Sequence, residues 1–297
     1  MTQIAAIPDR RDVLRGILSM LLCVVVFALM DALVKLAAER HPVGQIIFFR
    51  NVFAFLPLSF FIRRAGGLAV LRTRFVRQHV LRAVTGATSM AATFLAFSLM
   101  PLADVVAIGL SAPIFLTALS VPLLGEQVGW RRWSAVGAGF IGILLITRPG
   151  SGVFGAVALI PLAGAALYAV AMIQIRSVAT REPAATMAFY FTLAAAILGA
   201  VSLPWQWVTP SPSMLLCLVA IGILGGLAQM ALTEAYRLAP VSIVAPFEYS
   251  SLLFAAVLGY AIWGQVPDLF VWLGAAVVVA SGLYILHRET VRRRGDR

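Results

Sequence analysis

Apolar residues form ten long runs along this chain, separated by short segments that contain charged residues, prolines and glycines. Each run has about the 20 residues that an α-helix needs to cross a hydrocarbon core of about 30 Å. The pattern therefore predicts an all-α integral membrane protein with ten transmembrane helices and no soluble domain. The predicted spans cover residues 13–37, 43–62, 79–100, 103–123, 131–148, 153–175, 184–204, 213–236, 241–262 and 267–287.

Charge is scarce and unevenly placed. The chain is 61% hydrophobic and 12% charged, whereas about a quarter of the residues of a soluble domain are charged. With ten spans, 19 of the 23 lysines and arginines fall on one side, and only Lys35, Arg40 and Arg148 fall on the other. The positive-inside rule then places both termini in the cytoplasm. The net charge of +11 reflects this topology and attraction to anionic membrane lipid, so no nucleic-acid partner is predicted.

Part of the chain is repeated. The segment 96–133 matches the segment 139 residues later, and the match continues upstream with an offset of 141. Two similar halves of five spans each must have opposite orientations in the membrane, as in many transporters. We predict one five-helix repeat over residues 1–148 and a second, inverted repeat over 149–297. The matched residues are Phe97, Leu99, Pro101, Ser111, Phe115, Leu119, Gly125 and Trp133 with Tyr236, Leu238, Pro240, Ser250, Phe254, Leu258, Gly264 and Trp272, and then Phe27, Lys35 and Pro42 with Tyr168, Arg176 and Pro183.

Several motifs of the first half are shared with a known group of transporters. They are Phe27 and Lys35 in the first span, Arg50 in the second, Pro101 and Pro113 around the fourth, Leu124-Gly125-Glu126 at its end, and Gly137, Gly139 and Gly142 in the fifth. Together with the repeat, they resemble the ten-helix branch of the drug/metabolite transporter superfamily, which is built from two EamA-type repeats. The second half departs from the pattern at Gln265, at Leu252 and at Pro246.

The resemblance implies a secondary transporter of small polar metabolites that works by alternating access. It implies a midplane cavity surrounded by spans 1–4 and 6–9, with spans 5 and 10 at the periphery. The members most similar to this chain export amino acids across the bacterial inner membrane, which is the function and location that we expect. Multidrug efflux by proton antiport is the alternative.

Glu248 is the first candidate for the site, because a carboxyl group at membrane depth is costly. It follows Pro246, a residue that removes a helical hydrogen bond and favours a kink. Glu248, Ser251, Ala255 and Gly259 share one helix face of small or polar residues. The carboxylate could bind a substrate ammonium group or a proton. The alternative is a structural hydrogen bond to a neighbouring helix.

Arg50 is the second candidate, since a guanidinium group stays charged and needs a partner or water. Asp31 on the preceding span is a suitable partner, and Lys35 follows Asp31 by four residues. Either these three charges form a structural cluster near the outer mouth, or one of them receives a substrate carboxylate.

Uncharged residues complete the predicted site. Side chains that combine an apolar body with a polar group suit amphipathic ligands, although for any single one packing is the better explanation. The candidates are Tyr168, Gln174, Gln229 and Tyr249, and also Tyr190 and Tyr236. The predicted bending points are Pro101, Pro113, Pro240 and Pro246. Glu234 can pair with Arg237, so we interpret it as structural.

The sequence does not favour an enzyme. It shows no metal-ligand spacing of histidines, no clustered aspartates and no phosphate-binding loop. We therefore predict no metal, no cofactor and no direct use of ATP. The expected partners are a small-molecule substrate and membrane lipid, and we expect a monomer or a weak dimer.

Overall fold

The computed structural model describes residues 10–125, 129–148, 153–178 and 182–295, and every regular element in these ranges is a helix. The first half contains α1 (Arg10–Ala38), α2 (Val43–Ala65), η1 (Gly67–Leu71), α3 (Val76–Leu99), α4 (Leu102–Gly109), α5 (Ala112–Leu124) and α6 (Trp130–Thr147). The second half contains α7 (Val153–Val157), α8 (Leu159–Val178), α9 (Ala184–Gln206), α10 (Pro212–Leu238), α11 (Val241–Val244), η2 (Ala245–Ser250), α12 (Ser251–Trp263) and α13 (Leu269–Gly295).

Helices in the two halves begin and end at matching residues. Pro42 and Pro183 precede α2 and α9 with φ of −61° in both and ψ of 143° and 146°. Gly125 and Gly264 end α5 and α12 with φ of 67° and 65°. A side chain rarely tolerates this left-handed conformation, which explains glycine at both positions. The sequence repeat is therefore also a repeat of local structure.

The fourth span of each half is discontinuous. In the first half, the break between α4 and α5 lies beside Ser111, whose hydroxyl donates to the carbonyl of Ile108 at 2.5 Å. In the second, the change from η2 to α12 lies beside Ser250, whose hydroxyl donates to the carbonyl of Phe247 at 2.6 Å. A serine that bonds a carbonyl three residues back supports a local departure from regular α-helix. Broken helices are common where transporters bind their substrates.

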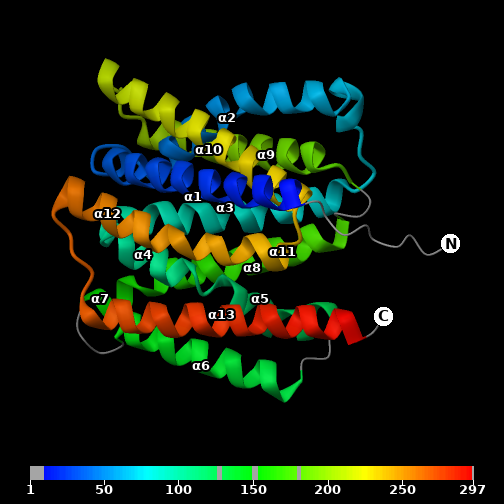
Figure 1. Ribbon diagram of the computed structural model, residues 1–297. Helices are drawn as coiled ribbons and strands as arrows, with labels where there is room; N and C mark the ends of the chain where they lie inside the picture. The colour runs from blue at the N-terminus through cyan, green and yellow to red at the C-terminus, as the bar shows by residue number, and fades with distance from the viewer. Residues whose placement is uncertain (1–9, 126–128, 149–152, 179–181, 296–297) are drawn as a thin grey trace.

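The helices form one bundle, in which α6 and α13 pack against each other at one edge (Figure 1). The start of α1 and the end of α13 lie at the same end of the bundle (Figure 1). We call this the arginine-rich end, because α2 ends there with Arg63 and Arg64 and α6 begins there with Arg131 and Arg132. The other is the opposite end, where the guanidinium of Arg148 pairs with the carboxylate of Asp268.

Nine segments of the described chain are long and apolar enough to cross a membrane. Three of them combine shorter elements, namely α4 with α5, α7 with α8, and η2 with α12. The one remaining predicted span, residues 131–148, corresponds to α6, which has 18 residues and carries Arg131 and Arg132 in its first turn. The prediction of an all-helical membrane protein with two repeats is confirmed. The division between residues 148 and 149 stays a prediction, since residues 149–152 lie outside the described part.

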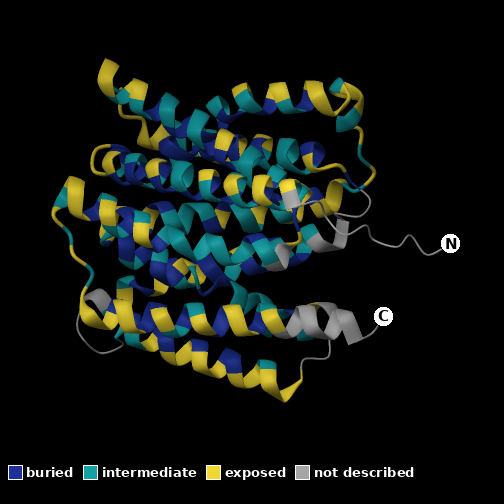
Figure 2. Cartoon of the chain, viewed as in Figure 1, coloured by how far each residue is buried: buried dark blue, intermediate teal, exposed yellow. Residues whose placement is uncertain are grey.

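The surface between the two ends of the bundle is apolar, as lipid contact requires. Figure 2 shows exposed residues along the outer faces of the helices and buried residues where helices meet. On α1, for example, Leu14, Leu18 and Leu22 recur every four residues and are more than half exposed. A stripe of large apolar side chains on the outside of a bundle is typical of a surface that faces lipid tails.

Close helix contacts depend on small residues. A Cβ atom added at Gly199 of α9 would lie 2.7 Å from the backbone nitrogen of Phe48 and 3.0 Å from the carbonyl oxygen of Gly44, both of α2. Similarly, a Cβ atom at Gly142 of α6 would lie 2.8 Å from the carbonyl oxygen of Gly274 of α13. Helix association in lipid relies on such close packing, because no hydrophobic effect drives helices together there.

Candidate substrate cavity

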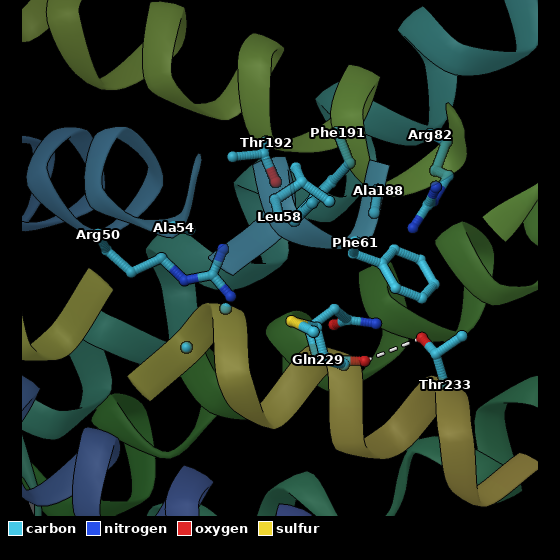
Figure 3. Close-up of a pocket in the computed structure, with 13 residues that line it drawn as sticks. Arg50, Ala54, Leu58, Phe61, Arg82, Ala188, Phe191, Thr192, Gln229 and Thr233 are labelled. Atoms are coloured by element: carbon cyan, nitrogen blue, oxygen red, sulfur yellow. Dashed lines mark hydrogen bonds between the residues drawn. The ribbon is translucent and has the colours of Figure 1, made fainter. Parts of the chain in front are cut away.

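A cavity lies between α2 and α3 of the first half and α9 and α10 of the second (Figure 3). It contains about 480 Å³ of space between atoms, but this figure includes space that is continuous with the outside. In this conformation the side chains leave only a narrow passage inside it. Its polar lining consists of Arg50, Arg82, Gln229, Thr192 and Thr233, and Phe61 and Phe191 contribute aromatic rings.

The guanidinium of Arg50 points into this cavity (Figure 3). Arg50 is only 8% exposed. Its Nη1 donates to Oδ1 of Asn51 at 2.9 Å, whereas its Nε, among the described residues, has no hydrogen-bond partner. Asp31 is close enough to attract Arg50 electrostatically, but in the described part of the chain the two side chains form no direct ion pair. A buried cation with a free donor is suited to bind an anionic group.

Space for the Arg50 side chain is left by a glycine on α10. A Cβ atom at Gly225 would lie 3.1 Å from Nε of Arg50 and 3.0 Å from the sulfur of Met30. At the next glycine, a Cβ atom on Gly226 would lie 2.3 Å from the ring of Pro57. These glycines let α10 approach α2 closely while the guanidinium stays in the cavity.

Arg82 is a second cation of the cavity, and our sequence analysis missed it. It lies on α3, where its Nη1 donates to the carbonyl of Met187 at 2.6 Å and its guanidinium lies 5.4 Å from the ring centre of Phe191. In the sequence, Arg82 is one of the 19 basic residues that the positive-inside rule places on one side of the membrane. Its position could have revealed it as a candidate for the site, because Arg82 is the seventh residue of α3 and falls inside a predicted span rather than in a connecting segment.

One face of α10 connects the cavity with Glu248. Gln229, Thr233 and Tyr236 follow one another at helical spacing, and the first two line the cavity. The hydroxyl of Tyr236 donates to the carboxyl group of Glu248 in η2. Glu248 does not line the cavity itself. It contacts the same face of α10 at Tyr236, beyond the residues that line the cavity.

Glu248 lies among side chains from both halves. Tyr168 of α8 and Cys23 of α1 are within electrostatic range of its carboxyl group. Tyr249 is also within this range, although a Cβ atom added at Gly282 of α13 would overlap the Tyr249 hydroxyl, so the phenol packs against that helix. The structure therefore brings Tyr168 and Glu248 near each other and directs Tyr249 toward α13.

Lys35 lies outside the cavity. Its ammonium donates to the carbonyls of Phe97 at 2.8 Å and Met100 at 2.6 Å, which are at the end of α3. A lysine here satisfies carbonyls that the helix itself leaves unpaired. Of the three charges predicted to cluster, Asp31 and Arg50 are neighbours, while Lys35 supports the end of α3.

The remaining predicted residues lie at contacts between helices. Oε1 of Gln174 on α8 accepts a hydrogen bond from the hydroxyl of Thr85 on α3 at 3.3 Å. Tyr190 donates to the carbonyl of Leu71 at 2.9 Å. Glu234, by contrast, pairs within α10, where it accepts two hydrogen bonds from Arg237 at 2.8 and 2.5 Å.

The four predicted bending points all lie at changes of helix type or direction. Pro101 directly precedes α4, and Pro113 lies in the first turn of α5, just after the break. Pro240 directly precedes α11, and Pro246 lies in the first turn of the 3₁₀ segment η2. Whether the helices bend at these prolines during transport stays a prediction.

The chain belongs to the EamA-like transporter family, whose model matches residues 14–148 and 154–286. It is 30% identical to a riboflavin transporter of Rhizobium johnstonii over 99% of this chain and 97% of that protein. It is 31% identical to the pseudopaline exporter CntI of Pseudomonas aeruginosa (90% and 94% covered) and 28% identical to an S-adenosylmethionine uptake transporter of Rickettsia prowazekii (93% and 94%).

The fold is also similar to that of a solved crystal structure, with a TM-score of 0.64 and 20% identity over 93% of this chain and 96% of that one. The protein is thus a multi-pass membrane protein and a secondary transporter of small metabolites, and it is not an enzyme.

Proposed function

We propose that the protein transports a metabolite that carries a carboxylate, such as an amino acid or an amino-acid derivative. The observation that supports this proposal is the pair of guanidinium groups, Arg50 and Arg82, on one cavity. Among the described residues that line it there is no aspartate or glutamate. Guanidinium groups bind carboxylates through charge-assisted and often paired hydrogen bonds.

The rest of the cavity suits the remainder of such a molecule. The rings of Phe61 and Phe191 offer apolar surface, and Gln229 offers an amide that can donate or accept a hydrogen bond. We place the protein in a bacterial inner membrane and expect export by alternating access. Since two of the relatives named above are an exporter and an uptake transporter, direction is part of what must be measured.

A counterflow assay in proteoliposomes tests the proposal. The panel contains labelled amino acids, riboflavin and S-adenosylmethionine. We expect exchange of at least one compound that has a carboxylate, and competition by its relatives but not by its amide or ester. Exchange of riboflavin alone would contradict the proposal, because riboflavin has no carboxylate.

Efflux of cationic drugs by proton antiport is the second candidate, and Glu248 favours it. A mid-membrane carboxyl group beside Tyr236 and Tyr168 suits a cationic or proton-bearing ligand. Drug-induced proton movement in the same proteoliposomes, without amino-acid exchange, would support this candidate instead.

Glu248→Gln separates a chemical role from a structural one. The amide keeps the size of the side chain and can still accept the hydrogen bond from Tyr236, so packing should persist. If the carboxyl group binds a cation or a proton, transport should fall at least about tenfold, equivalent to about 1.4 kcal/mol, at unchanged membrane expression. Initial rates in proteoliposomes measure this.

The matched control is Glu234→Gln. Glu234 is also a carboxylate that is bonded to a neighbouring side chain, but its partner is Arg237 at an exposed position. We expect nearly normal transport from this variant, since exposed ion pairs contribute little. Normal flux from a folded Glu248→Gln protein would assign Glu248 a structural role.

A further inference from the structure

The contacts between helices reveal which end of the bundle is closed. The repeat relates α1 to α8, α2 to α9, α3 to α10 and α6 to α13. In the discontinuous fourth span, α4 corresponds to α11 with η2, and α5 corresponds to α12. Most helix contacts occur in matching pairs at the two ends. The contact of α1 with α10 corresponds to that of α3 with α8, α2–α10 corresponds to α3–α9, and α5–α8 corresponds to α1–α12.

Among the contacts that join the two halves, one substantial contact has no such counterpart. At the opposite end, α4 packs against α12 and thereby joins the two halves. The corresponding segments at the arginine-rich end are α11 with η2 and α5. In the described ranges these segments make no comparable contact. The two halves therefore meet through these segments at the opposite end only.

Side chains reinforce the contact at the opposite end. The indole Nε1 of Trp263 donates to Oε1 of Glu39 at 2.9 Å, and the ammonium of Lys35 lies 5.4 Å from the centre of the Trp263 ring. In addition, Oε1 of Gln265 accepts from the backbone N–H of Leu102, at the start of α4, at 3.4 Å. Each interaction joins the first half to the second. The interactions of Trp263 belong to the matched α1–α12 contact, whereas the hydrogen bond of Gln265 joins α12 to α4. We call Leu102, Gly259 and Gln265 the outer gate.

Exposure at the other end agrees with an opening there. Tyr168, midway along α8, is 47% exposed, and Tyr236, near the end of α10, is 36% exposed. Both are within electrostatic range of Glu248, which lies between the halves. The cavity also lies toward this end, since Phe61 near the end of α2, Arg82 near the start of α3 and Thr233 near the end of α10 line it.

We propose that this structure is a state of the transport cycle that is open at the arginine-rich end and closed at the opposite end by the outer gate. For the halves to alternate, α4 must separate from α12 while α5 approaches α11 and η2. Contacts that occur in matching pairs then persist in both states. This inference rests on transport by alternating access, but not on the identity of the substrate.

A disulfide across the gate tests the proposal. A Cβ atom at Gly259 of α12 would lie 3.8 Å from Cβ of Leu102 of α4, which is the mean separation in disulfides. The pair Leu102→Cys with Gly259→Cys is made in a chain whose Cys23 and Cys217 are replaced by alanine. A third cysteine, Tyr168→Cys, reports which side can reach the interior.

The probe is a membrane-impermeant maleimide applied to vesicles of either orientation. Before oxidation, we expect Tyr168→Cys to react from both sides as the protein alternates. After the Leu102–Gly259 disulfide forms, reaction should continue from the arginine-rich end and fall at least about tenfold from the opposite end. Reductant should restore it. Continued reaction from the opposite end, loss of reaction from the arginine-rich end, or failure of the disulfide to form would each overturn the proposal.

A second disulfide at a persistent contact is the matched control. A Cβ atom at Gly164 of α8 would lie 3.3 Å from Cβ of Ala92 of α3, and this helix contact has its counterpart in α1–α10. The Ala92→Cys/Gly164→Cys disulfide should leave reaction from both sides unchanged. If it restricts access as well, the α4–α12 contact is not a distinct gate. Labelling needs no substrate, so a negative substrate panel leaves this test valid.

Discussion

Replacing Arg50 with glutamine is expected to lower transport of the preferred substrate at least about 30-fold. Loss of one partner from a buried charge pair costs at least about 2 kcal/mol, and 1.4 kcal/mol corresponds to a factor of ten. The effect should be large because Arg50 is buried and its Nε has no partner among the described residues. The measurement is the initial rate of exchange in proteoliposomes, together with the apparent affinity for the substrate.

The control for this variant is Arg63→Gln on the same helix. Arg63 is exposed at the end of α2, at the arginine-rich end and away from the cavity, so its loss should change transport less than about twofold. Arg50→Lys adds a test of geometry, because an ammonium group cannot form the paired hydrogen bonds of a guanidinium. Equal transport by Arg50→Gln and Arg63→Gln would remove Arg50 from the site.

Replacing Gly199 with valine is expected to destabilise the whole bundle. The added side chain would meet the backbone of Phe48 and Gly44, which cannot move aside without separating α9 from α2. Overpacking of this kind costs typically 1–3 kcal/mol, and we expect a cost of about 2 kcal/mol or more here. A lower melting temperature of the detergent-purified protein and lower membrane expression would report it.

Gly137→Val serves as the control for Gly199→Val. Gly137 lies within α6, and a Cβ atom there would have no neighbour within 4 Å. Both substitutions place the same β-branched residue in a transmembrane helix, so a difference between them measures packing rather than helix propensity. A Gly199→Val protein as stable as Gly137→Val would show that the α2–α9 contact tolerates separation.

Much of the fold could be predicted from the sequence, because a membrane allows few solutions. A backbone in lipid must satisfy its hydrogen bonds within each helix, so apolar length alone locates the spans. The predicted span 43–62, for example, corresponds to α2, Val43–Ala65. The repeat also identified matched positions such as Gly125 and Gly264, which have nearly the same φ. Pro113 and Pro246 indicated bending points in these spans, but the hydrogen bonds of Ser111 and Ser250 at the breaks were not predicted, because apolar periodicity continues across them.

The candidate site was predicted less completely. Polarity at membrane depth identified Arg50 and Gln229, and the structure places both on one cavity. The same criterion grouped Lys35 with Arg50, although the Lys35 ammonium binds carbonyls at the end of α3. Depth along a helix is visible in the sequence, but the direction of a side chain depends on helix rotation and on the neighbour that it meets.

The sequence by itself determined the number and the paired character of the spans, because apolar length and repeated residues are properties of the chain. Only the tertiary structure decided which polar groups share a cavity and at which end of the bundle α4 meets α12. Arg82 of α3 and Gln229 of α10 come together through helix packing between the two halves. Likewise, Gln265 meets Leu102 only because α12 packs against α4 at one end. Such contacts depend on the relative placement of two nearly equivalent halves, and one sequence must permit more than one placement if the protein is to transport.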